Sequence, residues 1–160
     1  MYVPLTMDRL AEAVAGGALP PGPAYAVTAG LREWYAEGEA DELEEAARDR
    51  AVQASLRLAA AGSASRRVVV AADTEALRVE PGVEEPGLLA LTAPVPREVW
   101  AAVLADEAAA APALAAAAAA LPSADAGDLE ALLVVDAVED HELLWWGVQE
   151  LEQLLAEAGG

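Results

Sequence analysis

The stretch Arg67-Val-Val-Val-Ala-Ala72 is the clearest strand signal in this chain of 160 residues. Its apolar side chains follow one another without a polar interruption, a pattern typical of a strand covered on both faces. We therefore expect it near the centre of a sheet. Asp73 and Thr74 follow directly, where the strand is expected to end.

Helix and strand signals alternate on both sides of this central segment. Further strands are expected at 3–6, 24–28, 77–80, 88–92 and 141–146. Helices are expected after Thr6 and Thr28, then over 41–61, 97–102, 108–121, 128–138 and 149–156. The order predicts an α/β fold in a single domain spanning 1–160, a sandwich of helices on a mixed sheet of about four to five strands.

The charge of the chain is strongly negative and unevenly distributed. Nine Arg and no Lys stand against 28 acidic residues, for a net charge of −19, and Cys is absent. Residues 98–160 carry 13 of the acids and none of the Arg. This composition excludes a disulfide framework, Cys-ligated metals, a lysine-dependent phosphate loop and direct binding to nucleic acid.

No segment of the sequence reads as a signal peptide or a membrane span. The N-terminus lacks a basic region followed by a long apolar one. The longest apolar stretch, 108–121, is interrupted by Pro112 and is shorter than the roughly 20 residues that a spanning helix needs. We therefore expect a soluble cytoplasmic protein with no membrane partner.

Polar residues at three predicted strand ends form one candidate ligand site. Thr6, Thr28 and Asp73 each follow a strand, and in a parallel sheet such ends converge at one edge. Two helix N-termini and two arginines would suit a small anion there. The full candidate set is Thr6, Arg9, Thr28, Arg32, Asp73 and Thr74. In the alternative interpretation the threonines only cap helices and the arginines are solvated.

The remaining candidate residues favour structural roles. His141 is the only histidine, and the second histidine of a zinc-binding helix is missing, so no catalytic residue, metal site or cofactor is expected. Trp145 and Trp146 are expected on opposite faces of a strand. Because the chain has no Phe, Trp34 and at least one of this pair are expected in the core.

Several strings in the chain together carry a resemblance to a known family. They are Tyr2-Val-Pro-Leu-Thr6, Leu31-Arg-Glu-Trp-Tyr35, Arg66-Arg-Val-Val69, Ala71-Ala-Asp73 and His141-Glu-Leu-Leu-Trp145. Together they resemble a family of small actinobacterial proteins known only as a domain of unknown function. The resemblance spans nearly the whole chain. It implies one domain in a bacterial cytoplasm and carries over no catalytic residue.

Three classes of function are compatible with these observations. The favoured one is a non-catalytic interaction or regulatory protein whose acidic surface, including Glu139, Asp140 and Glu142, meets a basic protein. The second is a small-anion binder or enzyme with its site at the carboxyl ends of the strands. The third is an acidic mimic of DNA that occupies a basic nucleic-acid-binding protein.

Overall fold

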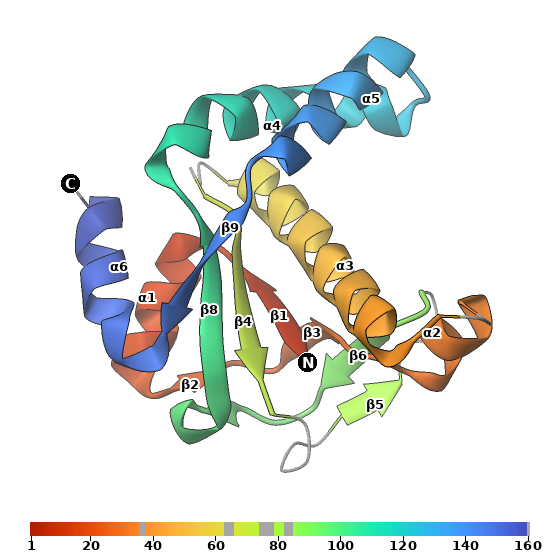
Figure 1. Ribbon diagram of the computed structural model, residues 1–160. Coiled ribbons are helices and arrows are strands. Elements are labelled where there is room, and N and C mark those ends of the chain that lie inside the picture. The colour runs from red at the N-terminus through yellow and green to blue at the C-terminus, as the bar shows by residue number, and fades with distance from the viewer. Residues whose placement is uncertain (36–37, 63–65, 74–78, 82–84, 160) are drawn as a thin grey trace.

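Helices cover both faces of an antiparallel sheet in the computed structural model (Figure 1), which describes residues 1–35, 38–62, 66–73, 79–81 and 85–159. The strands of the larger sheet are β1 (Tyr2–Leu5), β3 (Gly22–Tyr25), β4 (Val68–Ala72), β5 (Val79–Pro81), β6 (Leu88–Leu91), β8 (Trp100–Asp106) and β9 (Leu143–Gly147). Within the described ranges these seven strands lie in the order β5-β6-β3-β1-β4-β8-β9. A separate pair joins β2 (Ala18–Leu19) to β7 (Val95–Pro96).

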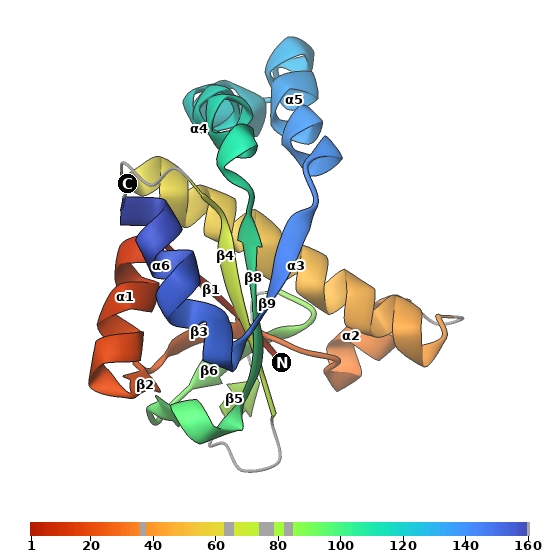
Figure 2. The ribbon, with the colours of Figure 1, turned by 60° about the vertical axis from the view of Figure 1, so that its left-hand side comes forward.

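The helices form one layer on each side of the sheet and a hairpin at one end. They are α1 (Met7–Gly16), α2 (Ala29–Trp34), α3 (Ala40–Ala61), α4 (Ala111–Asp125), α5 (Leu129–Asp136) and α6 (Leu151–Gly159). Short 3₁₀ turns occur at η1 (Arg97–Val99), η2 (Ala108–Ala110), η3 (Ala137–Asp140) and η4 (Val148–Glu150). Figure 2 shows α1 and α6 on one side of the sheet and α3 on the other, with α4 and α5 above the C-terminal end of α3.

The central strand is where the sequence predicts it. β4 lies between β1 and β8 and is buried on both faces. Val68 and Val70 pack into the core beneath α1 and α6, whereas Val69 packs beneath α3. The prediction of a strand covered on both faces is therefore confirmed.

One buried hydroxyl fastens α3 to the sheet. Ser55 of α3 donates a hydrogen bond to the carbonyl of Leu5 at 2.9 Å and accepts one from the N–H of Val68 at 2.7 Å. Leu5 and Val68 form the last residue pair between β1 and β4. The serine thus fixes the position of the helix over both strands while satisfying their buried backbone groups.

The α/β class is confirmed, but the predicted sheet is too small and its strand directions are wrong. The larger sheet has more than the expected four to five strands, and each pair of neighbours is antiparallel rather than mixed. Part of the error lies at 97–102, which was expected to be helical. That segment is η1 followed by the start of β8. Pairing with strands on both sides outweighs the helix preference of its alanines, which amounts to less than about 1 kcal/mol per residue.

One helical segment of the described chain, Ala108–Asp125, is long and apolar enough to cross a membrane by those two criteria alone. In the structure it packs against protein. Leu114 and Leu121 of α4 share a cluster of buried residues with Leu56 of α3 and Val138 of η3. This packing joins the α4–α5 hairpin to the sheet domain and forms one side of the cleft described next.

Candidate functional site

The three strand ends that are predicted from the sequence to converge do not lie at the same end of the strands. β1 runs antiparallel to both β3 and β4, and Tyr2 at its start lies opposite their C-terminal parts. Thr28 and Asp73 follow those C-terminal parts, whereas Thr6 follows the other end of β1. The parallel arrangement that the anion site requires is therefore wrong, and the strand ends do not converge.

The threonines of that predicted site are helix caps. The Thr6 hydroxyl accepts a hydrogen bond from the N–H of Arg9 at 3.4 Å, and the Thr28 hydroxyl accepts two backbone N–H groups at 3.1 and 3.0 Å. Arg9 and Arg32 are exposed on two different helices. Thr74 lies outside the described residues. The cap interpretation accounts for both threonines.

A cleft of about 810 Å³ lies on the α3 side of the sheet, where β8 and β9 extend beyond the helix. It is lined by Glu45, Arg48, Asp49, Val52, Gln53, Leu56, Arg57, Arg67, Leu104, Leu121, Val135, Asp136, Val138, Glu139, His141, Glu142 and Leu143. The cleft arises because α3 covers β1, β3 and β4 but leaves the last two strands open. The α4–α5 hairpin then closes one end.

One face of α3 forms the first wall. The lining residues between Glu45 and Arg57 recur at intervals of three and four, which places them on one side of a helix. Val52 and Leu56 lie on the apolar part of this face, and Gln53 adds an amide to it. The sequence carries this signal in its spacing, but nothing in the sequence alone shows that the face borders a cleft.

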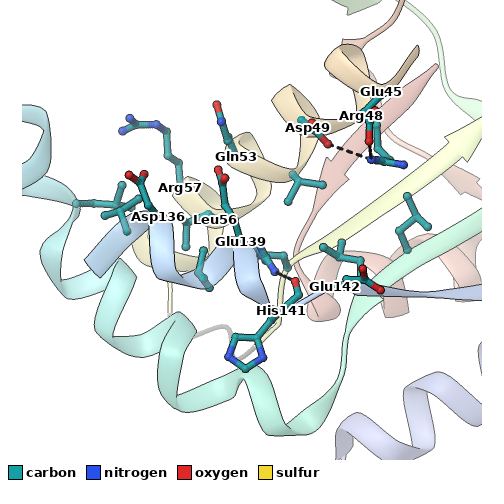
Figure 3. A pocket seen from close by; sticks show the side chains of 17 residues that line it. Glu45, Arg48, Asp49, Gln53, Leu56, Arg57, Asp136, Glu139, His141 and Glu142 are labelled. Atoms are coloured by element: carbon teal, nitrogen blue, oxygen red, sulfur yellow. Dashed lines mark hydrogen bonds and ion pairs between the residues drawn. The ribbon is translucent and has the colours of Figure 1, made fainter. Parts of the chain in front are cut away.

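The opposite wall comes from the segment that joins α5 to β9. Asp136, Glu139 and Glu142 belong to this wall, and Leu104 of β8 with Leu143 of β9 form an apolar floor. In Figure 3 the side chains of Asp136 and Glu139 extend toward the α3 wall. The result is an apolar trough with carboxylates along its rim.

The arginines of the cleft already have acidic partners. Arg48 contacts Glu45 at 2.9 Å and Asp49 at 3.3 Å, and Arg57 holds Asp125 through two hydrogen bonds of 2.8 Å. The hydrogen bond to Arg57 lowers the pKa of the Asp125 carboxyl below its ordinary value. Because this pair is exposed, it contributes little stability. Each arginine that lines the cleft thus has a carboxylate partner within the cleft or beside it.

Three carboxylates of the opposite wall contrast with these arginines. Asp136, Glu139 and Glu142 form no ion pair with any basic side chain in the part of the chain that the structure describes. Two of them, Glu139 and Glu142, are among the three acidic residues predicted from the sequence to meet a basic protein, and the fold brings both to the cleft. Asp140 is exposed but does not line it.

A buried ion pair holds the acidic wall in place. Arg67 and Asp106 are almost completely buried, and their side chains meet at 2.7 Å. The same guanidinium donates a hydrogen bond of 2.7 Å to the carbonyl of His141, just before β9. The position of the wall therefore depends on a contact between Arg67, which directly precedes β4, the end of β8 and the segment entering β9.

His141 lies at the surface beside an acidic residue. Its Nδ1 atom lies 4.0 Å from a carboxylate oxygen of Glu107, and its side chain is partly exposed. In Figure 3 the ring turns away from the α3 wall. Across the described residues, no group of three His, Asp or Glu side chains is arranged to hold a metal ion.

The aromatic residues are distributed differently from the prediction. Trp34 was expected in the core, but 69% of it is exposed. Trp145 and Trp146 do lie on one strand, with Trp145 68% exposed and Trp146 packed against the main core. The most buried tryptophan is Trp100, which starts β8 in the segment where the sequence predicts a helix. Trp145 pairs with Leu104, so this exposed ring is on the face that floors the cleft.

A family model described as a family of unknown function (DUF6912) matches residues 1–155, and the chain belongs to that family. No curated protein and no solved structure matches the chain. The family description assigns no activity.

Proposed function

We propose that this chain is a non-catalytic binding protein whose cleft receives a basic segment of a partner protein. The observation that carries the proposal is the charge balance of the cleft. Its arginines are paired, whereas Asp136, Glu139 and Glu142 have no basic partner among the residues described. A positively charged ligand is the occupant that this arrangement favours.

The shape and polarity of the cleft suit arginine or lysine side chains. These side chains lay their apolar stems along apolar surface and keep the charged group in a polar environment. The leucines of the floor, with Val52 and Leu56 of α3, offer the first, and the carboxylate rim offers the second. Arginine has the additional advantage that it pairs with a carboxylate through two hydrogen bonds.

The charge distribution of the whole chain supports the same ligand. The 13 acids of 98–160 have no Arg or Lys among them, and this C-terminal part of the chain supplies the acidic wall. A field of one sign accelerates the approach of an oppositely charged partner. It also disfavours nucleic acids and acidic peptides.

Binding of a labelled octa-arginine peptide, followed by fluorescence anisotropy, tests the proposal. We expect binding at about 20 mM salt and its loss near 300 mM, because the Debye length shortens severalfold over this range. The triple variant Asp136→Arg, Glu139→Arg and Glu142→Arg should weaken binding by about tenfold or more, since it replaces the unpaired carboxylates with like charges.

A matched variant separates the cleft from the overall charge. Asp8→Arg, Glu12→Arg and Glu152→Arg alter three exposed acids of α1 and α6 on the other side of the sheet and change the net charge equally. This control should retain most of the affinity. Equal weakening by both triple variants would show that the peptide responds to net charge and would refute a site at the cleft.

A further inference from the structure

The last strand of the sheet, β9, has an open edge beside the acidic cleft. It ends the strand order, so no strand pairs with its outer side in the described part of the chain. Its sequence, Leu143-Leu-Trp-Trp-Gly147, contains no charged residue and no proline. Charged residues and prolines are what proteins commonly place on an edge strand to prevent it from pairing with another chain. The other edge strand, β5, contains both Glu80 and Pro81.

Large apolar side chains are exposed along this open edge. Trp145 is 68% exposed and Leu144 is also exposed, on opposite faces of the strand. An extended peptide adds to an exposed sheet edge through main-chain hydrogen bonds, and the surface beside the edge selects its alternate side chains. An added strand would cover both residues and pair with outer backbone groups of β9 before Gly147, whose N–H already donates to the Glu150 carboxylate at 2.7 Å.

We propose that the basic segment binds as an additional strand on the outer edge of β9, with basic residues at every second position. This inference rests on the proposed function and adds the conformation and pattern of the ligand. Alternate residues of the added strand would face the side of the sheet that carries Trp145 and the cleft floor. A guanidinium there would stack on the Trp145 ring while lying near the carboxylates.

Charge argues for this occupant rather than a second copy of the chain. Two copies meeting at β9 would bring together two molecules of net charge −19, with Glu142 next to the strand in each. A basic segment meets the same edge with complementary charge. The acidic rim and the open edge therefore select the same ligand.

Two octapeptides of identical composition test the pattern. One alternates Arg and Val through its length, and the other places four Arg before four Val. Simple charge attraction binds both equally, whereas strand addition favours the alternating peptide by about tenfold, since only it directs all four cations to one face. The Trp145→Ala variant should weaken the alternating peptide, and Trp34→Ala, which removes an equally exposed ring from α2, should not.

Backbone methylation tests the strand geometry directly. Two forms of the alternating peptide are methylated on nitrogen, one at the four Arg and the other at the four Val. Because alternate N–H groups of a strand point to opposite sides, one form should lose about tenfold or more in affinity and the other should bind nearly as before.

The possible results separate this inference from the proposed function. If the block, alternating and methylated peptides all bind equally and the cleft reversal still weakens them, strand addition is refuted and the cleft function stands. If no basic peptide binds at low salt, both fail. If the chain forms a dimer that Trp145→Glu dissociates, the occupant of the edge is a second copy and this inference is overturned.

Discussion

Surroundings, rather than residue type, determine what each tryptophan of this chain does. Trp100 is only 5% exposed, and its indole N–H donates to the carbonyl of Val95 at 3.1 Å. Trp34 and Trp145 are mostly exposed. A large aromatic ring contributes to stability by the surface it removes from water, so these three residues differ sharply in their expected contribution.

Replacing Trp34 and Trp100 by alanine should therefore change the free energy of unfolding by very different amounts. Trp100→Ala leaves a cavity in the core and should lower the free energy of unfolding by about 3–5 kcal/mol. Trp34→Ala should change it by less than about 0.5 kcal/mol, as is usual for exposed positions. Urea unfolding measures both, and a large loss with Trp34→Ala would show that this ring is buried in solution.

The buried Arg67–Asp106 pair gives a second prediction at this scale. Asp106→Ala leaves a buried guanidinium without its counter-charge and should cost about 3–5 kcal/mol. Replacing the pair together, as Arg67→Met with Asp106→Leu, should cost less, because no uncompensated charge remains. The urea midpoints of Asp106→Ala and of the double variant compare the two costs. A double variant less stable than Asp106→Ala would contradict this account.

At the scale of elements, two tyrosines of the sheet pack against α3. Tyr2 and Tyr25 are paired across β1 and β3. Burial raises the pKa of both hydroxyls above their ordinary value, and the nearby carboxylates of Glu44 and Glu85 raise it further. In each case the folded state favours the neutral phenol.

This difference predicts a loss of stability at alkaline pH. Below a pH of about 10, both tyrosines are protonated in the folded and unfolded states, and their contribution is fully present. It is lost as the pH rises through the raised pKa values, because the unfolded chain releases the protons first. Unfolding midpoints measured against pH should fall less steeply for the Tyr2→Phe, Tyr25→Phe variant. Equal slopes for variant and parent would exclude the two tyrosines as the cause.

The elements also show which parts of the fold and site are predictable from sequence. Local patterns identify β4, the threonine caps and the alanine-rich helix, since each depends on a short run of side chains. They do not identify strand direction, which depends on how distant segments pair. For this reason the expected convergence of Thr6, Thr28 and Asp73 is wrong. Glu139 and Glu142 are close in sequence, in the segment that joins α5 to β9, and this segment forms one wall of the cleft.

At the scale of the whole molecule, charge opposes compactness. The 28 acidic residues face only nine arginines, and part of that positive charge is already used in local pairs. Folding concentrates the remaining negative charge in a smaller volume, which destabilises the compact state. The acidic cleft is one place where this repulsion is concentrated, so binding a cation and stabilising the fold are coupled through mass action.

Added salt should therefore stabilise this protein. Raising sodium chloride from about 20 to about 300 mM screens the repulsion and should raise the melting temperature by a few degrees. The reversal of Asp136, Glu139 and Glu142 to Arg changes the net charge from −19 to −13, so this variant should melt at a higher temperature at low salt and respond less to added salt.

Sodium sulfate at matched ionic strength separates screening from the exclusion of salt from the protein surface, since only screening depends on ionic strength alone. A melting temperature that falls with salt, or a reversal variant that melts lower than the parent at low salt, would mean that the acidic wall is held by attractive contacts instead. The same carboxylates would then be structural and not available to a basic ligand.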